Sequence, residues 1–129
     1  MNHSPNPILL IVEDDPAMRD LLELTLKQQF VPPFELKIAP NGLEALDIIQ
    51  ENPPTLMILD ILLPQMNGLQ LLQQLRTESI YSDIRIVVIS ALGVREVVQQ
   101  AIENGANDFL VKPFDMDTLI ERVKQVLTA

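Results

Sequence analysis

Five polar side chains of this sequence each stand at the end of an apolar run. They are Glu13, Asp14, Asp60, Ser90 and Lys112. If the runs are parallel strands of one sheet, all five side chains meet in the crevice beyond the carboxyl ends of the strands, where open α/β sheets bind ligands. The three carboxylates and one ammonium would leave a net charge of about −2 there, and like charges at close range do not all stay ionised without compensation.

The chemistry that this set could perform is phosphoryl transfer. A divalent cation with oxygen ligands would compensate the negative charge, and Mg²⁺ suits a site with few carboxylates because it keeps several of its waters. The transition state of phosphoryl transfer spreads negative charge over oxygens and needs positioned cations and donors. Asp60 can act as the nucleophile and form an aspartyl phosphate, while Lys112 and the Ser90 hydroxyl hold the phosphoryl oxygens.

Five extended segments must position these side chains. Residues 8–12, 55–60 and 84–90 are apolar runs, which is typical of central parallel strands covered on both faces. Residues 34–39 alternate apolar and charged side chains, as an edge strand does, and residues 108–111 form a short last strand. Because a helical segment follows each strand, the sequence predicts a five-stranded doubly wound parallel α/β sheet with helices on both faces.

The helical segments each carry one apolar face. They are residues 15–30, 41–52, 67–76, 94–106 and 115–127. The residues predicted to face the core are Met18, Leu21, Leu22, Leu26, Leu43, Leu46, Ile49, Leu71, Leu72, Leu75, Val94, Val97, Val98, Ala101, Leu119, Ile120, Val123 and Leu127. Asp15 is the predicted N-cap before Pro16, and Asn41 with Glu44 three residues on resembles a capping box. Gly105 is the predicted stop of the fourth helix.

Composition narrows the function classes. A chain of 129 residues is expected to form one domain, and its formal charge of −9 disfavours direct binding to nucleic acid or to anionic membranes. There is no cysteine, and the single histidine, His3, lies in a polar N-terminal tail, so no thiolate or imidazole chemistry is available within the fold. No secretory signal or apolar membrane span is evident, and we therefore expect a cytoplasmic protein.

Four stretches together resemble the receiver domain of two-component response regulators, of the single-domain type typified by chemotaxis regulators. They are "ILLIVEDD", "LMILDILLPQMNG", "VVISA" and "GANDFLVKPF", in the order and spacing of that family. The resemblance implies a flavodoxin-like sheet of strand order 2-1-3-4-5 with five helices, a receiver domain over residues 8–128 and a flexible tail over residues 1–7.

Site roles follow from the same resemblance. It implies that Asp60 accepts a phosphoryl group from a sensor histidine kinase or a phosphotransfer protein. Asp14 would bind Mg²⁺ directly and Glu13 through water, with Asp60 and the backbone carbonyl of Leu62 as further ligands. Lys112 would form a salt bridge in the site, and the bond between Lys112 and Pro113 would be cis.

The resemblance also implies a switch and a surface that transmits it. Ser90, where Thr is more usual, fills the switch hydroxyl position, and Phe109 fills the switch aromatic position. Phosphorylation would change the face made by the fourth helix, fifth strand and fifth helix, which a downstream protein recognises or through which the chain dimerises. The exposed candidates there are Gln99, Asn107, Asp108 and Arg122.

Two departures from the family pattern predict a long-lived phosphoryl group. Leu62 and Leu92 stand where some family members carry polar residues that help water to attack the acyl phosphate. We therefore expect no enzyme activity beyond self-phosphorylation and slow autodephosphorylation.

Other interpretations differ in the residues they require. A phosphohydrolase of the haloacid dehalogenase type is disfavoured because its second aspartate would stand at Leu62. A flavodoxin is disfavoured because Glu13 and Asp14 would repel the flavin phosphate. A phosphorylation-independent pseudo-receiver that acts only as an interaction module stays open, as does the choice between a stand-alone regulator and a fragment of a longer one.

Overall fold

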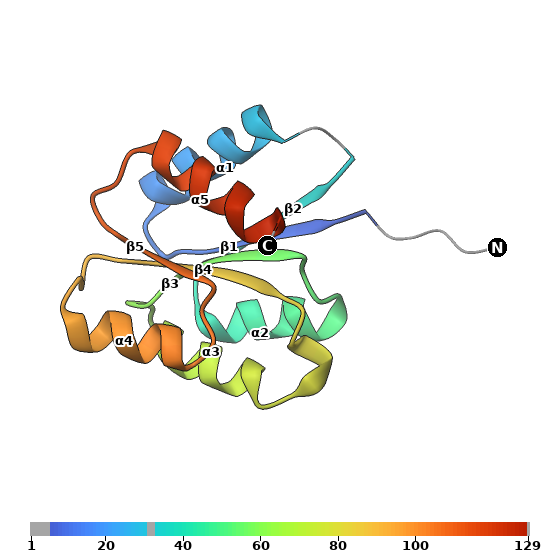
Figure 1. Cartoon of the computed structure of the whole chain (residues 1–129). Coiled ribbons are helices and arrows are strands. Elements are labelled where there is room, and N and C mark those ends of the chain that lie inside the picture. The colour runs from blue at the N-terminus through green and yellow to red at the C-terminus, as the bar shows by residue number, and fades with distance from the viewer. Residues whose placement is uncertain (1–5, 31–32, 129) are drawn as a thin grey trace.

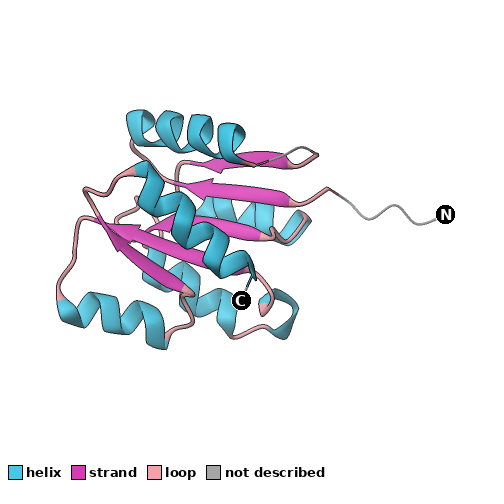
Figure 2. Cartoon of the chain, turned by 45° about the horizontal axis from the view of Figure 1, so that its top comes forward, coloured by secondary structure: helices cyan, strands magenta, loops and turns pink. Residues whose placement is uncertain are grey.

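The apolar runs form a single parallel sheet in the computed structural model, which describes residues 6–30 and 33–128. Its strands are β1 (Ile8–Val12), β2 (Glu35–Ala39), β3 (Leu56–Asp60), β4 (Arg85–Ser90) and β5 (Asp108–Val111). The order β2-β1-β3-β4-β5 confirms the predicted strand order, and the arrows of Figure 2 all point the same way. Of the predicted tail, residues 1–5 lie outside the described residues.

Helices cover both faces of this sheet, as predicted for a doubly wound fold. They are α1 (Pro16–Gln29), α2 (Gly42–Glu51), α3 (Gly68–Arg76), α4 (Arg95–Glu103) and α5 (Met116–Thr128), with a short 3₁₀ turn η1 (Ser79–Tyr81) between α3 and β4. Figure 1 shows α1 and α5 on one face and α2, α3 and α4 on the other. Within the described ranges no helix is long and apolar enough to cross a membrane.

Two hydrophobic cores lie on the two faces of the sheet because side chains alternate along each strand. Leu10 and Met57 lie in the core under α2, α3 and α4, while Ile11 and Ile58 lie in the core under α1 and α5. All four are at most 1% exposed, which is why β1 and β3 are apolar throughout.

The strand register brings the polar strand ends together. Val12 pairs with Leu59, the last residue before Asp60, so Glu13 follows β1 at the level where β3 ends with Asp60. Asp60 in turn pairs with Ile89, which places Ser90 one residue further along β4. The polar groups at the carboxyl ends of β1, β3 and β4 therefore lie along one edge of the sheet.

In each of three helical segments one residue that was predicted to face the core is exposed. Leu21 of α1, Leu43 of α2 and Val94 before α4 were expected in the core, but they are 44%, 47% and 54% exposed. Thr25 and Ala45 are buried instead, at 8% and 0% exposed. An amphipathic pattern indicates a broad apolar stripe, whereas the packing of the helix on the sheet decides which edge of the stripe faces inward.

The helix ends largely follow the predicted capping residues. The Asn41 side chain accepts a hydrogen bond from the Glu44 amide at 2.9 Å, and Gly105 ends α4 with a φ of 103°. Asp15 stands at the N-cap position of α1, but its side chain makes no capping hydrogen bond. The prediction for Asp15 is therefore confirmed in position, although no side-chain cap accompanies it.

Candidate functional site

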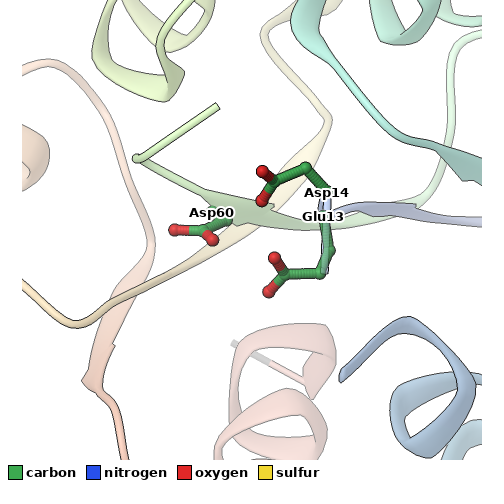
Figure 3. A group of neighbouring side chains, drawn as sticks. All are labelled: Glu13, Asp14 and Asp60. Atoms are coloured by element: carbon green, nitrogen blue, oxygen red, sulfur yellow. The ribbon is translucent and has the colours of Figure 1, made fainter. Parts of the chain in front are cut away.

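Three carboxylates meet where β1 and β3 end. One oxygen each from Glu13, Asp14 and Asp60 lies within 4.8 Å of the others, and Figure 3 shows the three side chains grouped around the ends of the two strands. Glu13 and Asp60 are 1% and 3% exposed, whereas Asp14 is exposed. The predicted acidic cluster is thus assembled from residues up to 47 positions apart in the chain, with one of its carboxylates open to solvent.

Lys112 joins the two buried carboxylates. Its Nζ lies 2.7 Å from Oε1 of Glu13 and 3.0 Å from Oδ2 of Asp60. The lysine reaches the site from the end of β5, where its backbone amide donates to the Ser90 carbonyl at 2.8 Å. The peptide bond between Lys112 and Pro113 is cis. One ammonium therefore serves two carboxylates that have little contact with water.

Backbone amides complete the hydrogen bonding of the buried acids. Oε2 of Glu13 accepts from the Asp15 amide at 3.1 Å, and Oδ1 of Asp60 accepts from the Leu62 amide at 3.1 Å. Both oxygens of Glu13 are thus engaged by protein groups. Both oxygens of Asp60 are held as well, which fixes the carboxylate in one orientation at the end of β3.

The pKa values of Glu13 and Lys112 are both raised by their surroundings. Burial raises the pKa of Glu13, the charge of Asp60 raises it further, and the hydrogen bond from Lys112 only partly offsets these effects. Burial acts to lower the pKa of Lys112, but its hydrogen bonds to Glu13 and Asp60 outweigh burial and raise it. Burial is thus the main obstacle to ionisation of Glu13, whereas two carboxylates hold Lys112 in its charged form.

The donor set fits a hard divalent cation. Oxygen ligands in a cluster of net negative charge are what Mg²⁺ prefers, and exposed Asp14 gives water access to the cluster. A bound cation would supply the positive charge that Lys112 alone does not. The described residues of the acidic cluster therefore suit the predicted metal.

The predicted switch residues lie on β4, which pairs with the strand of Asp60, and on β5, which lies beyond β4. Ser90 is fully buried at the end of β4, and its Oγ accepts a hydrogen bond from the Leu92 amide at 3.0 Å. Phe109 pairs with Val88 in the register of β4 and β5, and its half-buried ring packs against the core under α2, α3 and α4.

The predicted output face carries paired rather than free polar groups. Nη1 of Arg122 lies 2.8 and 2.9 Å from the two carboxylate oxygens of Asp108, and Gln99 donates to Glu103 at 3.0 Å. Oδ1 of Asn107 accepts from the Ile86 amide at 2.7 Å. The last contact ties Asn107 to β4.

Gly68 is a residue of the site that sequence reasoning missed. A Cβ on Gly68 would lie 2.5 Å from the Asp60 carbonyl oxygen and 2.7 Å from Cα of Ile61, closer than real Cβ atoms approach. The Gly68 amide also donates to the Ile61 carbonyl at 2.8 Å. The available signal was the Asn67-Gly68 pair directly after the strand, because glycine is favoured where backbones approach closely.

Comparison with known proteins agrees with this fold and site. The profile of the response regulator receiver domain family matches residues 9–124. Sporulation initiation phosphotransferase F of Bacillus subtilis is 34% identical over 122 residues, which cover 95% of this chain and 94% of its own length. The transcriptional regulatory protein KdpE of Staphylococcus aureus is 36% identical over 118 residues, which cover 92% of this chain and 48% of KdpE.

A solved structure gives the same result. The signal receiver domain of a signal transduction histidine kinase from Syntrophus aciditrophicus is 30% identical, with a TM-score of 0.84, over 95% of this chain and 90% of that one. The chain spans about half the length of several curated relatives that it matches.

The doubly wound sheet, the acidic cluster with its lysine and the family match together define the class of the protein as a signalling receiver domain. The chain belongs to the response regulator receiver domain family.

Proposed function

We propose that this chain is a phosphorylation-dependent switch of a two-component system, with Asp60 as the phosphoacceptor. The observation that carries the proposal is the state of Asp60, a 3% exposed carboxylate fixed by Lys112 and by the Leu62 amide beside Glu13 and Asp14. The phosphoryl donor is a sensor histidine kinase or a phosphotransfer protein, and the phosphoryl transfer takes place in the cytoplasm.

The transfer is a displacement at phosphorus. An oxygen of Asp60 attacks the phosphorus of the donor phosphohistidine and forms an acyl phosphate, the P–N bond breaks, and its electron pair stays on the imidazole, which takes up a proton. Lys112 balances the charge that gathers on the phosphoryl oxygens. Mg²⁺, when bound, would supply further positive charge beside Asp60. Its proposed protein ligands are Asp14, Asp60 and the backbone carbonyl of Leu62, with Glu13 acting through water.

The signal then passes from Ser90 and Phe109 to a protein partner. The Ser90 hydroxyl turns toward the phosphoryl oxygens, and Phe109 takes the space that Ser90 leaves. A downstream protein that prefers the changed face of α4, β5 and α5 binds it, or two copies of the chain pair through it. We propose no direct contact with nucleic acid, because the chain carries a formal charge of −9.

Intact mass tests the proposal. The wild-type chain is incubated with Mg²⁺ and acetyl phosphate, next to Asp60→Asn and to Asp47→Asn, a control at an exposed position on α2. We expect one phosphoryl adduct on the wild type and on Asp47→Asn, its loss in Asp60→Asn, and its loss when EDTA removes the metal. If no adduct forms with acetyl phosphate or with a histidine kinase as donor, the phosphorylation-independent interaction module replaces this proposal.

A further inference from the structure

The two ends of α4 are attached to the fold in different ways. None of residues 91–100 is buried, Val94 before the helix is 54% exposed, and the first helical turn has no side-chain cap. At the other end Ala101 and Ala106 are 0% and 8% exposed. The amide of Ala106 donates to the Ala101 carbonyl at 3.0 Å, and Gly105 donates to Ile102 at 3.0 Å. The end of α4 that lies nearer the acidic site is therefore the less firmly packed one.

Arg76, the last residue of α3, holds the firmly packed end. Its guanidinium donates to four backbone carbonyls and one side-chain oxygen. The acceptors are the carbonyls of Tyr81, Ser82, Ile84 and Gly105 and Oδ1 of Asn107. The shortest of these bonds, Nη2 to the Ile84 carbonyl, is 2.7 Å, and both Nε and Nη2 contact the Gly105 carbonyl, at 3.1 and 3.0 Å. One charged group thus joins α3, the segment before β4 and the turn after α4.

The turn after α4 fits closely around this guanidinium. Gly105 has a φ of 103°, and a Cβ at this position would lie 2.7 Å from Cγ of Arg76. Oδ1 of Asn107 accepts from Arg76 and also from the Ile86 amide, at 3.3 and 2.7 Å. A planar guanidinium with several donors can satisfy all these acceptors at once, which the ammonium of a lysine cannot do in the same geometry.

The loosely held end of α4 is connected to the switch hydroxyl. Oγ of Ser90 accepts from the Leu92 amide at 3.0 Å, and Leu92 lies in the segment between β4 and α4. A Ser90 hydroxyl that turns toward a phosphoryl group on Asp60 gives up this bond. The segment that leads into α4 then loses a restraint. None of residues 91–100 is buried, and Val97 is the residue of this range that packs, half-buried, against the core under α2, α3 and α4.

We infer that Arg76 makes the C-terminal end of α4 a fixed pivot, so that phosphorylation of Asp60 displaces the N-terminal end of the helix. Arg76 is a positioning residue and has no part in the chemistry. The inference rests on the proposed function and adds the direction in which the signal moves the output face. Without the hydrogen bonds of Arg76 both ends of α4 would move on phosphorylation, and the effect of the change at Ser90 would be spread over the whole helix.

Hydrogen–deuterium exchange with Mg²⁺ and beryllium trifluoride, a stable mimic of the acyl phosphate, tests the inference. In the wild type we expect the mimic to speed amide exchange by about tenfold in residues 91–98 and by less than about twofold in residues 101–107. In Arg76→Met the mimic should speed exchange in both segments. Arg95→Met, at an exposed position on α4, is the control and should behave as the wild type.

Two further measurements keep the outcome interpretable. If Arg76→Met does not fold, Arg76→Lys, which keeps the charge but not the fork of donors, should show the same spread to a smaller extent. Equal responses of the two segments in the wild type would overturn the inference, as would a folded Arg76→Met or Arg76→Lys that responds as the wild type does. Adduct formation with acetyl phosphate is followed in parallel by mass. A missing adduct in the wild type removes the proposed function and this inference with it, whereas a normal adduct with the wrong exchange pattern overturns the inference alone.

Discussion

Replacing Lys112 by Met removes the cation that two buried carboxylates share. The Nζ to carboxylate distances are 2.7 Å for Glu13 and 3.0 Å for Asp60, whose side chains are 1% and 5% exposed. Removing one partner of a buried ion pair costs about 3–5 kcal/mol, because the remaining charge stays out of water. Because the Lys112 side chain is 19% exposed, solvent weakens the pairing, and we expect a loss near the lower end, about 3 kcal/mol.

Urea unfolding in EDTA measures this loss of the free energy of unfolding. Lys124→Met, at an exposed position on α5, is the matched control for the loss of one positive charge from an acidic chain. Adding Mg²⁺ should then stabilise Lys112→Met more than the wild type, since a cation bound to the same carboxylates restores the missing charge.

The stabilising role of the Lys112 ion pairs is refuted if Lys112→Met in EDTA is as stable as Lys124→Met to within about 0.5 kcal/mol, the range typical of surface substitutions. That result would mean that Glu13 and Asp60 do not depend on the lysine in solution. An equal Mg²⁺ response of the two proteins would separately contradict a shared site for the ammonium and the ion.

Three further predictions follow from single positions. Gly68→Ala places a Cβ 2.5 Å from the Asp60 carbonyl oxygen and should lower the free energy of unfolding by about 1–3 kcal/mol in urea; an unchanged midpoint would show that α3 shifts freely. The phosphoryl group on Asp60 should persist for minutes or longer, because Leu62 and Leu92 at the site are 49% and 41% exposed and offer no hydrogen bond to an attacking water. Intact mass over time after donor removal measures its lifetime; Leu62→Asn with Leu92→Asn should shorten it, and a wild-type half-life of seconds would contradict the prediction. The Thr118 amide donates a hydrogen bond to Oδ1 of Asp115 at 2.8 Å and lowers the pKa of that carboxyl below the ordinary 3.8, so the stabilising effect of this bond is present above pH 3.8 and is lost as the pH falls through the folded-state pKa. The Tm difference between the wild type and Asp115→Asn, followed by circular dichroism, should therefore change across that range, and a constant difference would contradict this hydrogen bond.

Strand positions were predictable because burial on both faces leaves a simple signal. The predicted limits of β1 and β5 agree with the structure, and those of β3 and β4 agree to within one residue. A parallel strand between two helical layers has to be apolar throughout, so its sequence is an uninterrupted apolar run that ends where the chain returns to water. The ends of these apolar runs also mark the polar groups at the strand ends, which is why the acidic cluster could be predicted from the sequence.

The inward faces of the helices were less predictable. Leu21 and Leu43 belong to apolar stripes but are exposed, while Thr25 and Ala45 occupy the buried positions. A helix can be rotated by a fraction of a turn without changing its periodicity, and the choice is made by the shape of the sheet and of neighbouring helices. Local sequence does not contain that information.

The order of the elements and the side chains at the carboxyl ends of the strands follow from local patterns in the sequence. How these side chains share their charges depends instead on contacts between segments far apart in the chain. Lys112 meets Glu13 and Asp60 across 99 and 52 positions of the chain, and Arg76 meets Gly105 across 29. Periodicity and capping are local properties of the backbone, whereas a contact between distant segments depends on how helices and strands pack and on the rotamers that the packing leaves. For that reason the acidic site, Lys112 included, was predictable as a set of residues, whereas the sharing of Lys112 between Glu13 and Asp60 and the contacts of Arg76 with the turn after α4 were not.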